Sequence, residues 1–294
     1  MPVTTTAATV ADDPRRPWRK RIISVVAHVV LIAASILMLY PLLWMLAASF
    51  RPEREIFSST SLIPSAVTLN GYISGWHGLP LSFGTFFINS FTISVLCIIG
   101  NLAACSMTAF AFARLNFRGK RFWFALMLGT LMLPYQVTLI PQYVLFLKLG
   151  WVNTFLPLVV PKYLASDAFF TFLMVQFFRG IPKELDEAAQ MDGCSPWRIY
   201  YKVLLPLSVP VLTTAAIFTF IFTWDDFFGP LIYLNDIKTY TVALALRNFV
   251  DSTGISNWSG LFAMSVLSLV PVFVFFLFFQ RLLIEGIATT GMKR

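Results

Sequence analysis

A short acidic segment contains the residues whose types and spacing point most directly to a function. Glu184, Asp186, Glu187 and Asp192 lie between two strongly apolar stretches. The sequence has no Ser/His/Asp, Cys/His or paired-carboxylate arrangement of a catalytic kind, so these acids indicate binding and a chain that is not an enzyme. A polar segment between two membrane-crossing helices lies at the water interface, where a soluble protein can reach it. The segment is therefore predicted to be a docking surface.

The elements that position these acids can be read from the same segment. Pro182 is a natural first helical residue, and residues 183–190 are expected to form a short helix with carboxylates in its first turns. Ala188 and Ala189 would let another surface approach closely. Gly193 supplies a turn before a second short helix. The expected element is a helix–turn–helix that lies across the inner membrane face.

The composition is typical of an integral membrane protein. Of 294 residues, 57% are hydrophobic and 12% are charged, and a soluble domain would not leave so little charge for its surface. The formal net charge of +8 comes from short loops beside apolar blocks, which argues against nucleic acid binding. Cys97, Cys105 and Cys194 lack the spacing of metal ligands and are expected to be small buried hydrophobes, so no metal site is predicted.

The apolar blocks predict an all-α membrane domain with six transmembrane helices, because each block can cross about 30 Å of hydrocarbon. Residues 1–20 are expected to form a disordered cytoplasmic tail, and residues 21–294 a single transmembrane domain. Proline and glycine predict bends in the third span at Pro134 and Pro141, and in the fifth near Gly229-Pro230. The expected spans are residues 22–49, 85–113, 122–147, 154–178, 205–233 and 259–279.

The basic residues predict the orientation of these spans. Lys and Arg number five in residues 15–21, four in 114–121, four in 179–202 and three in 281–294. The loops on the opposite side hold five basic residues in all. Because cytoplasmic loops carry an excess of Lys and Arg, both termini and the acidic segment are expected in the cytoplasm.

The spacing around the acidic segment resembles the coupling loop of ABC importer permeases. It runs Glu187-Ala-Ala, three residues, Gly193, nine residues, an aliphatic residue, one more residue, and Leu205-Pro206. From about residue 20 onward the chain is similar to permease subunits of carbohydrate-uptake ABC importers, in particular the smaller membrane subunit of the maltose type. Val203 stands where the family usually has Ile, and Asp225-Asp226 where an Asn-containing pair is expected. Further supporting strings are Asn89-Ser90 and residues 109–115, 133–141 and 279–286.

This resemblance implies an importer subunit in the bacterial cytoplasmic (inner) membrane, in contact with membrane lipid. The implied partners are a second homologous permease, an extracytoplasmic substrate-binding protein and a dimer of ABC ATPase subunits. Glu187, Ala188, Ala189, Asp192 and Gly193 would dock on an ATPase. Because the chain contains no Gly-x-x-x-x-Gly-Lys-Ser/Thr motif, it is expected to bind no cofactor itself, and ATP and Mg would be bound by the partner ATPase.

Polar residues within the spans are candidates for the translocation pathway, because ionisable groups are costly in a membrane. Asn89 and Asn101 are expected to form hydrogen bonds between helices, and Lys162 to snorkel from a span end. The candidates for a pathway or gate are Gln136, Gln142, Asp167, Asp225 and Asp226.

Two questions about function stay open in the sequence. The resemblance fits a sugar or oligosaccharide, or else glycerol 3-phosphate or a related glycerophosphodiester. The spans show no obvious basic cluster for a phosphate, which favours neutral sugars. An ion-coupled secondary transporter is the alternative class, and Asp167 is the one plausible coupling acid near the membrane midplane.

Overall fold

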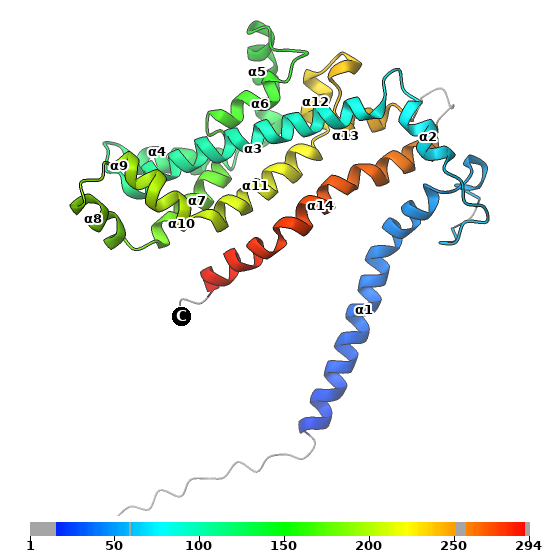
Figure 1. Cartoon of the computed structure of the whole chain (residues 1–294), viewed down its shortest axis with the longest axis horizontal. Helices are drawn as coiled ribbons and strands as arrows, with labels where there is room; N and C mark the ends of the chain where they lie inside the picture. The colour runs from blue at the N-terminus through cyan, green and yellow to red at the C-terminus, as the bar shows by residue number, and fades with distance from the viewer. Residues whose placement is uncertain (1–15, 59, 251–256, 292–294) are drawn as a thin grey trace, which may run out of the picture.

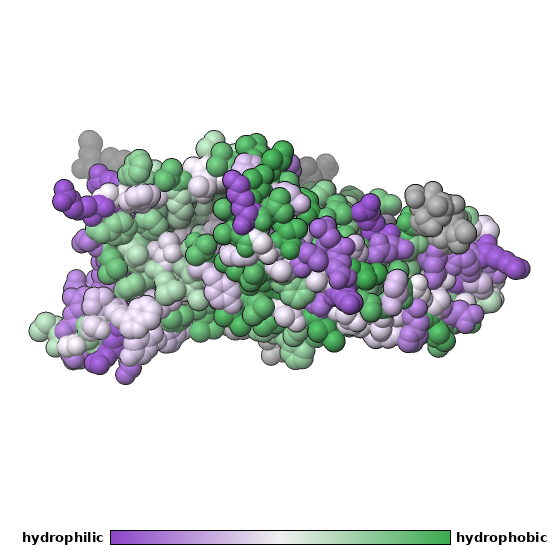
Figure 2. Space-filling model, turned by 90° about the horizontal axis from the view of Figure 1, so that it is seen from above, coloured by the Kyte–Doolittle hydropathy of each residue, from purple (hydrophilic) through white to green (hydrophobic). Residues whose placement is uncertain are grey.

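The computed structural model describes residues 16–58, 60–250 and 257–291. These residues form helices and connecting loops, and none of them lies in a strand. Residues 1–15 of the predicted tail lie outside the described residues, and the first helix, α1 (Arg16–Ala48), begins directly after them. Figure 2 shows hydrophilic side chains gathered at both ends of the visible face, with mostly hydrophobic side chains between them. The all-α prediction is therefore confirmed for the described residues.

Four helical stretches are long and apolar enough to cross a membrane, and two bent helix pairs pass the same test together. The single stretches are Arg21–Ala48, Phe83–Arg114, Leu156–Gly180 and Trp258–Gln280. The described residues therefore contain four candidate spans, or six if each bent pair is one span. The number six stays a prediction.

The central helix of the bundle is α3 (Phe83–Arg114). It packs against α6 (Leu156–Tyr163), α7 (Ala168–Gly180) and α11 (Val209–Trp224). Figure 1 shows α3 running along the length of the molecule beside these helices. Half of its most apolar stretch is buried, so α3 connects the two ends of the bundle through a packed core.

Hydrogen bonds from two asparagines of α3 link it to its neighbours. Asn101 is fully buried, and its Nδ2 donates to Thr219 Oγ1 of α11 at 2.8 Å. Asn89 Nδ2 donates to the carbonyl oxygens of Lys238 and Tyr240, at 2.8 and 2.9 Å. The predicted hydrogen bond between helices is confirmed for Asn101, whereas Asn89 bonds to the loop around the 3-10 turn Ile237–Thr239.

The third predicted span is a bent pair of helices. α4 (Lys120–Thr130) and α5 (Tyr135–Lys148) meet at 100°. Pro134 directly precedes α5, where its missing N–H removes no helical hydrogen bond. The predicted bend at Pro134 is confirmed, whereas Pro141 lies inside α5 and causes no break.

The fifth predicted span is broken twice, once near the predicted position and once near its start. The helical turns at Pro196–Leu207, which precede α11, meet it at 76° across Ser208. A second break at residues 225–227 separates α11 from α12 (Phe228–Tyr233). The predicted interruption near Gly229-Pro230 is therefore confirmed, although the break comes just before these two residues, which lie inside α12. Prolines on both sides of Ser208, at positions 206 and 210, account for the first break.

The last helix, α14 (Trp258–Gly291), packs against α2 (Asn70–His77), α11 and the end of α1. Figure 1 shows the rest of α1 leaning away from the other helices, and its most apolar stretch is not buried. An apolar helix outside the bundle needs lipid or another membrane subunit to cover it. Three further short elements lie in the connections: η1 (Glu53–Glu55) between α1 and α2, and η3 (Ile237–Thr239) and α13 (Val242–Arg247) between α12 and α14.

Gly71 of α2 lies where three segments meet, and this gives a testable prediction for the fold. A Cβ at Gly71 would lie 2.7 Å from the Ser259 carbonyl oxygen and 3.2 Å from that of Ser49. Because both neighbours are backbone atoms, Gly71→Ala is expected to lower stability by about 1–3 kcal/mol. The measurement is the midpoint of thermal unfolding in detergent. Gly129→Ala is the control, since an added Cβ there meets no other atom of the described part of the chain within 4 Å. Equal losses in both variants would contradict the prediction.

Candidate functional site

The acidic segment forms two short helices joined by a tight turn. α8 (Glu184–Met191) is followed by Gly193 and then by α9 (Pro196–Ile199). Gly193 has a φ of +76°, in the left-handed region that favours glycine. The side chain of Ser195 caps α9 by accepting a hydrogen bond from the Arg198 amide. The predicted helix–turn–helix is confirmed as a local structure, and its role in docking stays a prediction.

The side chains of this element divide into an exposed set and a buried set. Ala189 is half-buried against the protein core, while Ala188 beside it is exposed. Met191 is 88% exposed, an unusual position for a large apolar side chain. We define the α8–α9 surface as seven of the exposed residues of this element: Leu185, Glu187, Ala188, Met191, Asp192, Gly193 and Trp197. Met191 and Trp197 are of the residue types that are enriched at protein interfaces, and both are exposed here.

Asp186, predicted as one of four acids in a polar helix, is buried and joins α8 to α3. Its Oδ2 lies 2.6 Å from Nε of Arg114, the last residue of α3, and both side chains are nearly buried. Arg114 Nη2 also donates to the Ile181 carbonyl oxygen at 2.8 Å. Burial raises the pKa of Asp186 above its ordinary value, and the positive charges of Arg114 and Lys183 only partly oppose this effect. The ion pair therefore fixes α8 to the central helix without exposing either charge.

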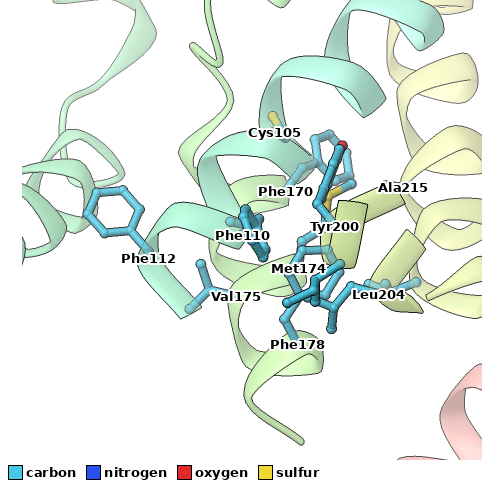
Figure 3. Close-up of a cluster of buried hydrophobic side chains, with 13 residues drawn as sticks. Cys105, Phe110, Phe112, Phe170, Met174, Val175, Phe178, Tyr200, Leu204 and Ala215 are labelled. Carbon is cyan, nitrogen blue, oxygen red and sulfur yellow. The ribbon is translucent and has the colours of Figure 1, made fainter. Parts of the chain in front are cut away.

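A hydrophobic cluster holds the second half of the element against the bundle. Tyr200 and Leu204, which belong to the π-helical turn η2 (Tyr200–Leu204), are buried among residues of α3, α7 and α11 (Figure 3). The centroids of the Tyr200 and Phe110 rings are 5.3 Å apart, and the Tyr200 hydroxyl lies 2.7 Å from Ser106 Oγ. The chain continues through α10 (Leu205–Leu207) into α11. The α8–α9 surface is thus connected to three helices of the bundle by buried contacts.

A polar cavity lies between α5, α6 and α12, at a distance from the α8–α9 surface along α3. Its volume is about 440 Å³, within the range of small-molecule sites. Lys162 Nζ and Asp167 Oδ2 form an ion pair at 2.8 Å in its wall. This pair was not predicted for Lys162: the break between α6 and α7 turns the two side chains toward each other. The snorkelling of Lys162 stays a prediction. The polar lining residues are Tyr135, Gln142, Lys162, Ser166, Asp167, Asp226 and Tyr233.

The structure separates the five candidates for the pathway. Gln142, Asp167 and Asp226 line this cavity, whereas Gln136 and Asp225 do not belong to its lining and are exposed. Sequence reasoning missed Tyr135, Ser166 and Tyr233. Tyr135 had one signal, its position directly after Pro134 at the bend between α4 and α5. Ser166 and Tyr233 had none, because the breaks beside them contain neither proline nor glycine.

Residues 99–289 match the family described as binding-protein-dependent transport system inner membrane component. This match covers most of the chain and includes both the α8–α9 surface and the cavity. The chain belongs to this family.

Relatives of this transport-system component include permeases with different named substrates. The chain is 36% identical over 257 residues to the arabinooligosaccharides transport system permease protein AraQ of Halalkalibacterium halodurans, covering 86% of this chain and 91% of the relative. It is 30% identical over 274 residues to the sn-glycerol-3-phosphate transport system permease protein UgpE of Brucella abortus, covering 91% and 96%. Similarity over nearly the whole length supports the expected resemblance to ABC importer permeases.

A solved structure shows the same fold for this transport-system component. A chain from the crystal structure of a bacterial ABC transporter involved in the import of the acidic polysaccharide alginate superposes with a TM-score of 0.80 at 22% identity. The alignment covers 93% of this chain and 99% of that chain. The arrangement of helices described above is therefore also the fold of a chain in that transporter.

Proposed function

We propose that this chain is one of two permease subunits of an ATP-driven, binding-protein-dependent importer for a sugar or oligosaccharide. Membership of the family supports the transport role, and the name of AraQ supports the substrate class. In this proposal the chain forms half of the translocation pathway. A second permease forms the other half, an extracytoplasmic binding protein delivers the substrate, and separate ATPase subunits bind ATP and Mg.

The observation that carries the proposal is the buried connection of the α8–α9 surface to the bundle. Glu187 and Ala188 are exposed on a helix whose Asp186 is fixed to α3 by the ion pair with Arg114. A partner that moves this surface would move α3 with it, because buried contacts of this kind do not deform gradually. The surface can therefore pass a movement from an ATPase to the pathway.

The proposal places the protein in the bacterial inner membrane with both termini and the α8–α9 surface in the cytoplasm. The excess of basic residues in the loops on that side supports this orientation. Arg114 ends α3 and is paired with Asp186 of α8, and Arg179 lies in the last turn of α7, as expected for helix ends at a cytoplasmic interface.

The ion-coupled alternative is less well supported by the cavity. A coupling acid in a secondary transporter must bind and release an ion. Asp167, the residue predicted for this role, is already paired with Lys162 at 2.8 Å. The geometry of this ion pair therefore favours transport that is driven by a separate ATPase over transport that is driven by an ion gradient.

The proposal is tested by purifying the chain from its host and measuring uptake into vesicles. We expect a second permease and an ATPase to co-purify with it, and uptake to require ATP and the binding protein. Collapse of the proton and sodium gradients should leave uptake intact. Uptake that follows either gradient without ATP would replace this proposal with the secondary-transporter alternative.

A further inference from the structure

The polar cavity lies beside the central part of α3, away from both ends of the bundle. Cys97 of α3 donates from Sγ to the Leu158 carbonyl oxygen of α6 at 3.4 Å, and Cys105 to that of Asp167 at 3.6 Å. Leu158 and Asp167 both line the cavity. Cys97 and Cys105 lie in the middle part of α3, which has 32 residues from Phe83 to Arg114. The cavity beside them is therefore near the middle of the membrane-crossing length. Charged and polar side chains at such a depth mark a substrate or ion route.

The charges of the cavity do not suit an anion. Among the residues that line it, Lys162 is the one cation, and its ammonium is paired with the Asp167 carboxylate. Asp226 adds a second carboxylate, whose Oδ1 accepts a hydrogen bond from the Gly229 amide at 3.1 Å. A phosphate needs unpaired guanidinium or ammonium groups, and here it would meet two carboxylates. The wall therefore repels anions.

The remaining polar groups suit a ligand with many hydroxyls. The Gln142 amide and the Ser166 hydroxyl each offer both donors and acceptors. Tyr233 is buried between the rings of Tyr143 and Phe146. Its hydroxyl faces the Tyr135 side chain but makes no hydrogen bond of good geometry within the described residues. A buried hydroxyl without such a bond is a ready partner for a ligand.

We propose that this cavity is a substrate-contact site of the permease that takes uncharged, hydroxyl-rich ligands of the sugar class and excludes phosphorylated anions. The inference rests on the proposed import function and narrows its substrate class. Gln142 and Tyr135 contact the ligand, while Asp226 and the Lys162–Asp167 pair set the charge of the site.

The first test measures uptake by the complete transporter, with its binding protein, in proteoliposomes. The radiolabelled probes are maltose, arabinotriose, diacetylchitobiose and sn-glycerol 3-phosphate. We expect uptake of at least one neutral sugar and none of glycerol 3-phosphate. Gln142→Ala should raise KM for the transported sugar at least tenfold. Gln136→Ala, on the same helix but outside the cavity lining, should stay within twofold of the wild type.

The second test measures the charge of the cavity without reference to a substrate. Ser166→Cys, in a transporter whose Cys97, Cys105 and Cys194 are replaced by serine, is labelled with a cationic and an anionic methanethiosulfonate reagent. We expect the cationic reagent to react at least tenfold faster, and Asp226→Asn to reduce that ratio. The amide oxygen that Asp226→Asn introduces can still accept the hydrogen bond from the Gly229 amide, so α12 should stay folded. Asp225→Asn, the neighbouring acid outside the lining, should leave the ratio unchanged.

The outcomes distinguish this inference from the proposed function. ATP-dependent uptake that Gln142→Ala and Gln136→Ala affect equally would overturn the cavity as a contact site and leave the importer intact. Uptake of glycerol 3-phosphate, or faster labelling by the anionic reagent, would overturn the charge selection. If no probe is transported and ATP hydrolysis does not respond to the binding protein, the import function itself fails, and the labelling ratio still decides the charge of the cavity.

Discussion

Gly193→Asp in the assembled transporter is expected to abolish most substrate uptake while the permease stays folded in the membrane. Within the described residues, an added Cβ at Gly193 has no atom within 4 Å beyond its own chain neighbours, so it clashes with none of them. The same Cβ would project from the α8–α9 surface toward a docked ATPase. The φ of +76° adds a strain of about 1 kcal/mol, which Asp tolerates better than most residues. Uptake should fall at least tenfold, measured together with ATP hydrolysis in the same proteoliposomes.

Two control variants separate docking from backbone strain and from charge. Gly193→Ala adds the same left-handed strain with the smallest side chain, and its uptake should fall less than that of Gly193→Asp. Glu187→Lys, an exposed change on α8, should uncouple ATP hydrolysis from uptake as Gly193→Asp does. Glu184→Lys makes the same charge change one turn earlier, outside the Glu-Ala-Ala spacing, and should have a smaller effect. Normal uptake in both Gly193→Asp and Glu187→Lys would remove the α8–α9 surface from the coupling mechanism.

The local structure of the α8–α9 element could be predicted because short-range rules determine it. Gly193 takes the positive φ that the turn requires, and Pro196 begins α9, as helix-boundary chemistry predicts. The bend at Pro134 follows from the same kind of rule. Each of these features depends on a few neighbouring residues and needs no knowledge of the packed bundle.

The features that sequence reasoning missed depend on distant segments. Asp186 meets Arg114 across the bundle, and nothing in the spacing of four acids singles out the one that is buried. Lys162 and Asp167 are five residues apart, so in the continuous helix that was predicted their side chains would point in different directions. The break between α6 and α7 brings them together. Such breaks are set by packing against α3, which the sequence does not state.

The ion pair between Arg114 and Asp186 should behave as a positioning contact whose single loss is costly. Asp186→Ala leaves a nearly buried guanidinium without its carboxylate, which is expected to lower stability by about 3–5 kcal/mol. Burial raises the pKa of Asp186 above its ordinary 3.8. An acid with a raised native pKa contributes stability at low pH that is lost as the pH rises through the native pKa. The wild type should therefore lose stability relative to Asp186→Asn as the pH rises from 3.8 toward neutrality, measured by thermal unfolding in detergent.

The double variant Arg114→Met, Asp186→Leu distinguishes stability from coupling. Because the desolvation of a buried pair can outweigh its Coulomb attraction, apolar residues of similar volume should restore stability to within about 1 kcal/mol of the wild type. Restored stability does not restore the orientation of α8 relative to α3. The ion pair sets that orientation, and Arg114 also donates a hydrogen bond to the Ile181 carbonyl oxygen. We therefore expect a folded transporter that hydrolyses ATP but imports at least tenfold less substrate per ATP. Full coupling in the double variant would show that apolar packing alone passes the movement to α3.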